Sequence, residues 1–332
     1  MSQARFDFDL PTPAEEPAAP RPPRAAADPE RLAQKLERHP DYRVLRRLQP
    51  RLDFGPEPAG AAEGSPHRCR ALVLDTETTG LVHATDRIIE LAMLLVAVDV
   101  RTGQPFGPVQ VFEGFEDPGM PIPEKAKEVT GISDDMVRGQ RLDDAAVGAL
   151  VAQADLVVAH NAGFDRPFVE ARFPAFADKA WACSFQDIDW KAAGAGSSKL
   201  GALAADQGWF FDAHRAQVDC HALLQVLTRP VGTDLRNGWG QLIDAAAATR
   251  FRLRAVGAPF ERKDLLKARG YRWDAEARVW SCMLPTEALL DAECDWLRTE
   301  VYGRSGVRLE VEALDSRVRY SARPGKRLAV VL

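Results

Sequence analysis

The sequence has few cysteines, and none is spaced as in a metal or redox motif. Its five cysteines, in 332 residues, are odd in number and scattered, without a C-x-x-C pair. They therefore suggest neither a zinc cluster nor a disulfide framework, and we expect a reducing compartment. The N-terminal segment lacks the basic and then apolar succession of a signal peptide. The apolar stretch at 88–100 is too short and too acidic to span a bilayer, so we expect a soluble, cytoplasmic protein with no membrane partner.

Composition divides the chain into several parts. With 46% hydrophobic residues, the chain can bury a sizeable core and form more than one domain. The first part is rich in Pro and Ala and is predicted to be disordered. Residues 28–50 have a helical pattern, with Asp28 as the N-cap. The predicted parts are a disordered tail (1–28), a helical extension and linker (29–66), a main domain (67–230), and a helical connection with a small basic α+β domain (231–332).

The main domain mixes strands and helices. Apolar runs predict strands that end near residue 75, at 87–98, near 109–115 and at 155–160, and helical periodicity dominates after them. This order favours an α/β or α+β sheet covered by helices.

The C-terminal part differs in both pattern and charge. Residues 251–284 read as a strand, a helix and a hairpin through Asp274, and a capped amphipathic helix follows. Residues 241–332 carry 17 Lys and Arg against 13 Asp and Glu, whereas the whole chain has a net charge of −5. A basic C-terminal part could therefore hold a polyanion close to an acidic main domain.

Two acids follow the first apolar strand of the main domain. In "ALVLDTETTG", Asp75 and Glu77 are two residues apart. Alternate side chains of a strand point to the same face, so the two carboxylates are held together. This arrangement costs free energy unless a positive charge lies between them, and a divalent metal is the obvious candidate.

Three further residues extend this candidate site. Asp165 follows an apolar strand on the first turn of a predicted helix. His214 and Asp219 are five residues apart, which is about 140° of net rotation on a helix, so both cannot share one helical face. We therefore expect His214 in the preceding loop or first turn, and Asp219 inside the helix.

Taken together, these residues carry a family resemblance. The set Asp75, Glu77, Asp165, His214 and Asp219, with the phrases "DTETTG", "IIELA", "IPEKAKEVTGIS", "VAHNAGFD" and "HRAQVDCHALL", resembles the DEDDh 3′ to 5′ exonuclease superfamily. The best-known member is the proofreading ε subunit of bacterial DNA polymerase III. The resemblance covers about residues 69–230 and implies a ribonuclease H-like mixed β-sheet flanked by helices. Several motifs must match in order, which makes it specific.

The resemblance also implies a mechanism. Two Mg²⁺ or Mn²⁺ ions would clamp the scissile phosphate, with Asp75 bridging them, Glu77 and Asp219 completing one shell, and Asp165 holding the other ion. His214 would take a proton from the attacking water, a task suited to a side chain that titrates near neutrality. The product would be a nucleoside 5′-monophosphate.

Other residues are candidates for nucleic-acid binding. Thr78 could offer its backbone N–H to the 3′ end, and Phe164 could stack a terminal base or belong to the core. A C-terminal segment resembles a small module of bacterial DNA-processing proteins, in which Lys263, Lys267 and Arg269 could touch phosphates; a solvated helix face is the alternative. Glu90, inside an apolar strand, needs a partner, so a salt bridge or a supporting role near the site is expected.

A short peptide upstream suggests a protein partner. Residues 49–54, "QPRLDF", resemble the peptide with which bacterial replication proteins bind the sliding clamp. Alternatively, Leu52 and Phe54 could pack on the main domain. The extensions on both sides of the main domain also make a proofreading subunit a less direct interpretation.

The sequence thus predicts a metal-dependent 3′ to 5′ exonuclease acting on single-stranded or frayed DNA, with roles in DNA replication or repair. Three alternatives stay open: an RNA-trimming exoribonuclease, a polymerase-bound proofreader, and a nucleic-acid-binding scaffold with a disabled nuclease fold. The complete set of five residues counts against the scaffold.

Overall fold

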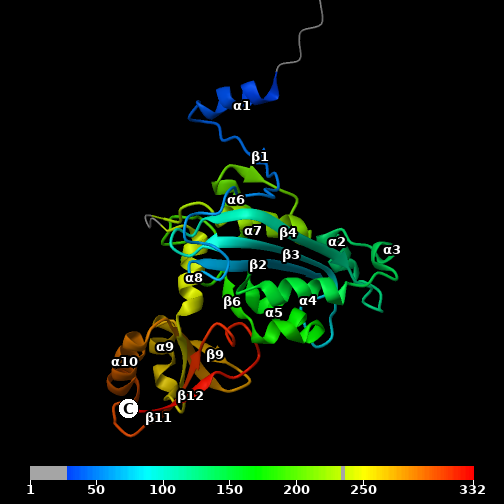
Figure 1. Ribbon diagram of the computed structural model, residues 1–332. Helices are drawn as coiled ribbons and strands as arrows, with labels where there is room; N and C mark the ends of the chain where they lie inside the picture. The colour runs from blue at the N-terminus through cyan, green and yellow to red at the C-terminus, as the bar shows by residue number, and fades with distance from the viewer. Residues whose placement is uncertain (1–27, 233–235) are drawn as a thin grey trace, which may run out of the picture. The chain divides into compact units, whose positions relative to one another are not determined.

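The computed structural model describes residues 28–232 and 236–332 (Figure 1). The predicted disordered tail, apart from Asp28, therefore lies outside the described residues. Of the described residues, 28–44 belong to one compact unit and those from Leu45 onward belong to another. In the first unit, α1 (Pro29–Glu37) begins at its predicted N-cap, where the Asp28 carboxylate accepts a hydrogen bond from the Glu30 backbone N–H at 3.1 Å.

The predicted helix over residues 28–50 is too long. The helix stops at Glu37 because Pro40 disfavours helical geometry in the residue before it. Farther along, β1 (Arg46–Arg47) pairs in parallel with β7 (Trp209–Phe210). This strand depends on a partner that is far away in sequence.

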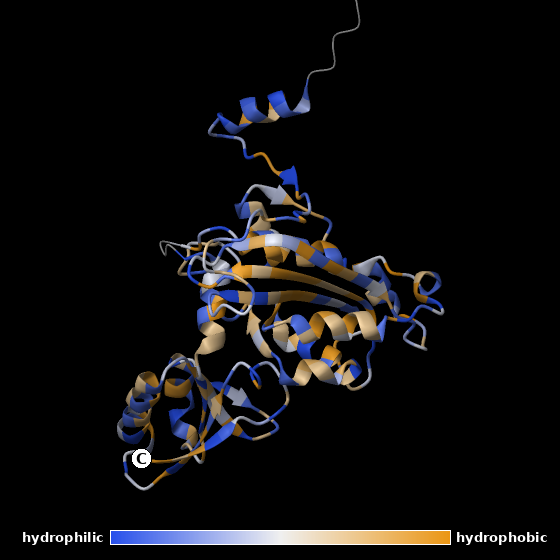
Figure 2. Ribbon diagram, in the orientation of Figure 1, coloured by the Kyte–Doolittle hydropathy of each residue, from blue (hydrophilic) through white to orange (hydrophobic). Residues whose placement is uncertain are grey.

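A five-stranded mixed sheet, with the strand order β4-β3-β2-β5-β6, forms the centre of the second unit. Its antiparallel half joins β2 to β3 and β3 to β4, and its parallel half joins β2 to β5 and β5 to β6. Figure 2 shows hydrophobic residues along the central strands. The strands are β2 (Arg68–Thr78), β3 (Ile88–Asp99), β4 (Pro105–Phe115), β5 (Leu156–Ala159) and β6 (Ala180–Cys183). The mixed β-sheet flanked by helices that the resemblance implied is confirmed.

Helices cover this sheet, and their apolar side chains form two large clusters with the strands. Both clusters take residues from β2, so this strand lies at the centre of the core. The helices are α2 (Glu124–Thr130), α3 (Asp134–Val137), α4 (Asp144–Gln153), α5 (Ala162–Arg172), α6 (Leu200–Asp206), α7 (Ala216–Val226) and α8 (Gly238–Ala247), with a 3-10 turn at Pro174–Asp178.

The segment that resembles a clamp-binding peptide lies along β4. The Val109 N–H donates to the Leu52 carbonyl at 2.9 Å, and the Phe54 N–H donates to the Gly107 carbonyl at 2.9 Å. The Phe54 ring packs against the core, whereas Leu52 is exposed. These contacts agree with the alternative in which the segment packs on the main domain.

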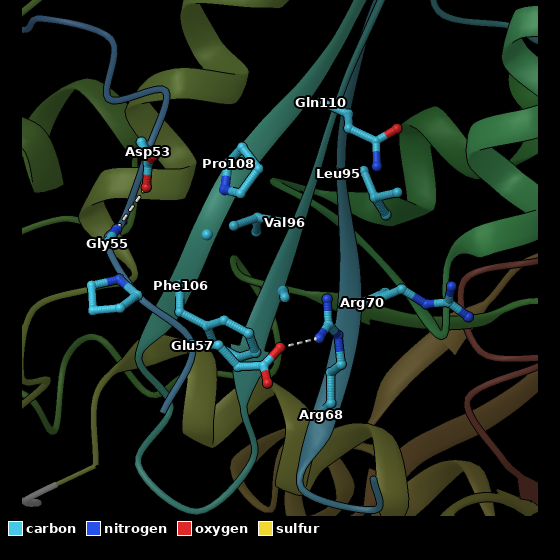
Figure 3. Close-up of a pocket in the computed structure, with 13 residues that line it drawn as sticks. Asp53, Gly55, Glu57, Arg68, Arg70, Leu95, Val96, Phe106, Pro108 and Gln110 are labelled. Carbon is cyan, nitrogen blue, oxygen red and sulfur yellow. Dashed lines mark hydrogen bonds and ion pairs between the residues drawn. The ribbon is translucent and has the colours of Figure 1, made fainter. Parts of the chain in front are cut away.

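Just beyond this segment, the linker borders a pocket of about 540 Å³ over β2, β3 and β4. Glu57 accepts a hydrogen bond from Arg68 Nη1 at 2.8 Å across this pocket (Figure 3). None of the five predicted catalytic residues lines it.

Residues 250–332, called the C-terminal module below, contain an antiparallel sheet in the order β12-β11-β8-β10-β9. Its apolar side chains pack with those of its helices in a separate core cluster. The predicted small α+β part is confirmed. Its elements are β8 (Arg250–Ala255), a 3-10 turn (Phe260–Arg262), α9 (Lys263–Ala268), β9 (Arg272–Asp274), β10 (Val279–Leu284), α10 (Glu287–Trp296), a π-helical turn (Leu297–Tyr302), β11 (Arg308–Leu314) and β12 (Lys326–Val331).

The loop between β11 and β12 lies against α5 (Figure 1) and contacts Arg166, the residue that follows Asp165. The Arg166 side chain is fully buried and donates to the backbone carbonyls of Ser316, Arg317 and Arg319. A buried guanidinium needs such partners, because an unpaired charge away from water is costly.

A second contact between the C-terminal module and the mixed-sheet domain is ionic. Asp187, which follows β6, has a fully buried side chain, and its Oδ1 lies 2.8 Å from Arg250 Nη2 and 3.2 Å from Arg319 Nη1. The Trp181 backbone N–H donates to the Ser316 carbonyl at 2.8 Å. The C-terminal module is thus attached to the mixed sheet by buried polar contacts.

Within residues 28–232 and 236–332, no helix combines the length and the apolar character needed to cross a membrane.

Candidate active site

Asp75 and Glu77 lie in the last four residues of β2. Both are partly buried, and the residues between and after them, Thr76 and Thr78, are buried. The strand therefore continues through the two acids to Thr78. As the alternation of side chains predicts, both carboxylates reach the same pocket.

Asp165 is held against β2 by Thr76. The Thr76 hydroxyl donates to Asp165 Oδ1 at 2.8 Å, and the Thr76 backbone N–H donates to the same oxygen at 3.1 Å. Asp165 lies in the first turn of α5 and is almost fully buried. Two donors on one oxygen fix the orientation of the carboxylate.

His214 and Asp219 adopt the arrangement that helical geometry requires. His214 precedes α7 with φ of 67°, whereas Asp219 lies inside the helix. Asp219 Oδ2 accepts hydrogen bonds from the backbone N–H of His214 at 2.8 Å and of Arg215 at 3.2 Å. The left-handed conformation, which His adopts more readily than most residues, turns the chain so that both groups face one pocket.

All five predicted residues line one pocket of about 460 Å³. Oxygens of Asp75, Glu77 and Asp219 lie within 4.8 Å of one another, close enough to share a cation. Asp165 borders the same pocket but is not part of this closest group within the described residues.

The carboxylates raise one another's pKa. Burial, with the charges of Asp219 and Glu90, raises the pKa of the Glu77 carboxyl to about 8. Burial and the charges of Asp165 and Asp219 hold the pKa of Asp75 well above its usual range. Negative charge therefore dominates this end of the pocket, and the hard oxygen donors present suit a divalent cation.

The pKa values of the other two acids, Asp165 and Asp219, are raised as well. Burial raises the pKa of Asp165 to about 7, although the hydrogen bonds from Thr76 oppose the shift. Burial raises the pKa of Asp219 to about 6, against the hydrogen bonds from the backbone of His214 and Arg215. At neutral pH, full ionisation of this cluster is thus unfavourable without a cation.

Glu90 has the salt bridge that its burial predicted. Arg215 Nη2 donates to Glu90 Oε1 at 2.9 Å, and the Ala216 backbone N–H donates to Oε2 at 3.0 Å. A partly buried residue, His160, also borders the pocket, and its Nδ1 lies 2.7 Å from the Ser184 hydroxyl. Burial lowers the pKa of His160 to about 4.

The predicted nucleic-acid-binding residues separate into two groups. Thr78 and Phe164 line the pocket; the Thr78 hydroxyl donates to the Gly80 carbonyl at 2.6 Å. Phe164 is half-buried and its ring centroid lies 5.2 Å from that of Phe168.

The other three residues lie on or next to α9 and do not line the pocket. Lys263 Nζ lies 4.1 Å from the centroid of the Phe260 ring. Lys267 Nζ lies 6.0 Å from the centroid of the Trp280 ring. Arg269 Nε lies 3.0 Å from Glu293 Oε2, with which it forms an ion pair. Phosphate contacts by these three residues stay a prediction.

Sequence reasoning missed several residues of the pocket. One of them is Thr76, which holds Asp165 by hydrogen bonds. One indication of this role was present in the sequence, because Thr76 lies between the two acids of a strand and its side chain must point to the other face. Leu81 lines the pocket with 83% of its surface exposed, and Lys125 on α2 lines it as well. An exposed leucine and a lysine near "DTETTG" and "IPEKAKEV" have no distinctive pattern of their own.

Comparisons with known proteins agree with this geometry. Residues 72–227 match the family model described as "Exonuclease". DNA polymerase III PolC-type of Listeria welshimeri is 39% identical over 103 residues, and that of Halalkalibacterium halodurans is 40% identical over 105. These matches cover 30% and 31% of this chain, and the chain spans 7% of the length of each relative.

Similar solved structures include two exonucleases bound to DNA. Exonuclease X in complex with 5′ overhanging duplex DNA is 24% identical, with a TM-score of 0.37, over 48% of this chain and 89% of that one. E. coli Exonuclease I with a dA16 oligonucleotide is 16% identical, with a TM-score of 0.39, over 55% and 48%. On the family match and the relatives' sequences, the resemblance is confirmed: residues 72–227 are similar to exonuclease domains.

Proposed function

We propose that this protein is a metal-dependent 3′ to 5′ exonuclease that releases nucleoside 5′-monophosphates from single-stranded or frayed DNA. The observation that carries the proposal is the convergence of Asp75, Glu77, Asp165, His214 and Asp219 on one pocket. The name of the relatives, DNA polymerase III, favours DNA over RNA as the substrate. The nuclease domain proposed here spans residues 67–230, and the basic part spans 231–332.

The donor set fits divalent cations. Asp75, Glu77 and Asp219 would hold one cation, and Asp165 would hold a second together with Asp75. When bound, two Mg²⁺ or Mn²⁺ ions would supply positive charge for the attacking and leaving oxygens of the phosphodiester.

His214 is the proposed general base. It is exposed at the pocket, and its backbone N–H is hydrogen-bonded to Asp219, so its position is tied to that of the carboxylates. From there its imidazole would take the proton of the attacking water. Thr76 would hold Asp165 in place during this step.

Other predictions are retained as proposals. An RNA-trimming activity is the closest alternative, since discrimination between DNA and RNA depends on contacts to the 2′-hydroxyl. A sliding-clamp partner through residues 49–54 and a polymerase-bound role are also untested. A reducing, cytoplasmic setting agrees with five unpaired cysteines.

The test is a degradation time course on matched DNA and RNA oligomers, single- and double-stranded, with Mg²⁺ or Mn²⁺. A 5′ label should give a ladder that shortens from the 3′ end, and a 3′ label should be released at once as a mononucleotide. Asp75→Asn, which removes charge at nearly constant shape, should abolish both signals. Activity of this variant, or activity in excess chelator, would overturn the proposal, and preferred digestion of RNA would favour the alternative.

A further inference from the structure

A third cavity lies where the C-terminal module meets the exonuclease domain. Its volume is about 780 Å³. Gly163 and Phe185 border it on the exonuclease side, and residues of β8, β9 and β10 border it on the other. We call it the basic groove.

The groove is lined by positive charge. Among the residues that the structure describes, four arginines line it and no Asp or Glu does: Arg250, Arg252, Arg272 and Arg319. Arg250 and Arg319 are paired with the buried Asp187, and Arg252 Nη1 lies 3.2 Å from Glu312. Arg272 is exposed and has no ion pair within the part of the chain that the structure describes. The groove therefore has positive charge to offer a ligand.

Strand register explains why these arginines share a face. Arg252 lies opposite Met283 across β8 and β10, and Arg272 lies opposite Ser281 across β9 and β10. Phe251 and Leu253, which alternate with Arg252, point into the core of the module. One face of the sheet is thus apolar and buried, while the other presents arginines to the groove.

The groove adjoins the catalytic pocket. Gly163 lines the groove, and the next residue, Phe164, lines the pocket. Phe185, 41% exposed, lines the groove, and its ring centroid lies 5.6 Å from that of His160, which lines the pocket. A polymer whose end lies at the carboxylates can therefore continue past these residues into the groove.

We propose that the basic groove binds the sugar-phosphate backbone of the single strand whose 3′ end occupies the catalytic pocket. This inference rests on the proposed nuclease function. Arginine suits phosphate recognition because its planar guanidinium donates several hydrogen bonds, and an exposed aromatic ring next to it suits base stacking. An acidic peptide would use the same charges, but it would have no reason to adjoin a nuclease pocket.

The groove differs from the surface that the sequence suggested. Lys263, Lys267 and Arg269 lie on or next to α9, and none of them lines the groove. The arginines of β8 and β9 have no distinctive sequence pattern, and only the register of the sheet brings them together. The module would therefore contact nucleic acid through its sheet.

The test compares two exposed arginines of the C-terminal module. Arg272→Gln removes a charge from the groove, and the matched control Arg304→Gln removes one from a residue that lines neither cavity. The readout is binding of metal-free protein to oligo-dT of about 4 and about 20 nucleotides at several salt concentrations. Metal-free protein is used so that binding is measured without turnover.

We expect Arg272→Gln to weaken binding of the long oligomer about three- to tenfold and to lower its salt slope by about 0.7, as for one lost phosphate contact. Binding of the short oligomer should be unchanged, and Arg304→Gln should behave like the wild type. Equal effects of the two variants, or equal loss for both lengths, would overturn the proposal. If Arg272→Gln weakens binding as expected but the wild type releases no nucleotide with metal, the proposed nuclease function fails while the groove proposal stands.

An acidic peptide of similar charge density serves as the competitor. If oligo-dT displaces the bound peptide, and Arg272→Gln weakens the binding of both ligands, the groove is a nucleic-acid site. Peptide binding that exceeds oligo-dT binding would overturn the assignment in favour of a protein partner.

Discussion

Glu90 on β3 lies directly opposite Glu77 on β2 in the antiparallel register of the mixed sheet. Such neighbours point to the same face, so the buried Glu90 adds its charge to the carboxylate cluster and raises the pKa of Glu77. Arg215, one residue after His214, pairs with Glu90. The pair therefore neutralises Glu90 and connects the start of α7, which carries Asp219, to the sheet.

Removal of Arg215 should expose the cost of this buried carboxylate. We expect Arg215→Gln to lower the free energy of unfolding by about 1–3 kcal/mol, below the value for a fully buried pair because the guanidinium is partly exposed to solvent. The double variant Glu90→Gln/Arg215→Gln should recover part of the loss, since no charge is left unpaired. Urea denaturation of the metal-free proteins measures both. A double variant less stable than Arg215→Gln would contradict this account.

The carboxylate cluster should make the metal-free protein less stable as pH rises. The pKa values of Asp219, Asp165 and Glu77 are raised in the folded state to about 6, 7 and 8, above the ordinary value near 4 for carboxyls. The folded chain therefore binds more protons than the unfolded chain between about pH 4 and pH 8, and stability falls across this range.

Thermal melting in chelator, compared with melting in Mg²⁺ or Mn²⁺, tests this dependence. We expect the gain in Tm on metal addition to be larger near pH 8 than near pH 5, because protons compete with metal for the carboxylates. Asp75→Asn should have a shallower pH dependence and a smaller gain. A metal effect independent of pH would argue against a cation site at this cluster.

His214 should matter for turnover more than for binding. We expect His214→Ala to reduce single-turnover rates by about 10²- to 10⁴-fold, as for loss of a general base, with oligonucleotide affinity nearly unchanged. The control His214→Asn tolerates the left-handed backbone at this position but has no basic group. If His214→Asn were as active as the wild type, the residue would serve only the conformation of its loop.

Thr76 should act through Asp165. Thr76→Val keeps the shape of the side chain and removes the hydroxyl donor to Asp165 Oδ1. We expect metal affinity or turnover to fall about 10- to 100-fold, the usual cost of losing a hydrogen bond that orients a ligand. Thr76→Ser, which retains the hydroxyl, should restore most of the loss. Similar losses in both variants would mean that the threonine methyl group, rather than its hydroxyl, is what matters.

Local patterns and motif order predicted much of this molecule. Asp75 and Glu77 were placed by the period of a strand, and His214 and Asp219 by the rotation of a helix. Asp28 was found as a cap because capping depends on adjacent residues. These features need only short stretches of sequence, so the sequence contains the information for them.

The remaining features depend on contacts between distant segments. The short strand at Arg46 exists because β7 lies beside it, although the same residues have a helical pattern. The role of Thr76 depends on α5, and the basic groove depends on the register between β8, β9 and β10. The hydrophobic periodicity of a single segment cannot indicate which distant segment it will pair with.

The guanidinium of Arg166 has a consequence for how the protein unfolds. Its carbonyl partners belong to the loop between β11 and β12, whereas Arg166 itself belongs to the helix that carries Asp165. Separating the C-terminal module from the mixed-sheet domain would remove these three acceptors and leave Arg166 with Glu170 and the Ala177 carbonyl, so neither part should melt long before the other. We expect one cooperative calorimetric transition for residues 45–332, and truncation before β8 should lower the melting temperature of the remaining nuclease domain. The C-terminal module is thereby a structural component of the protein, and exchanging it for an unrelated domain would require new acceptors for the Arg166 guanidinium.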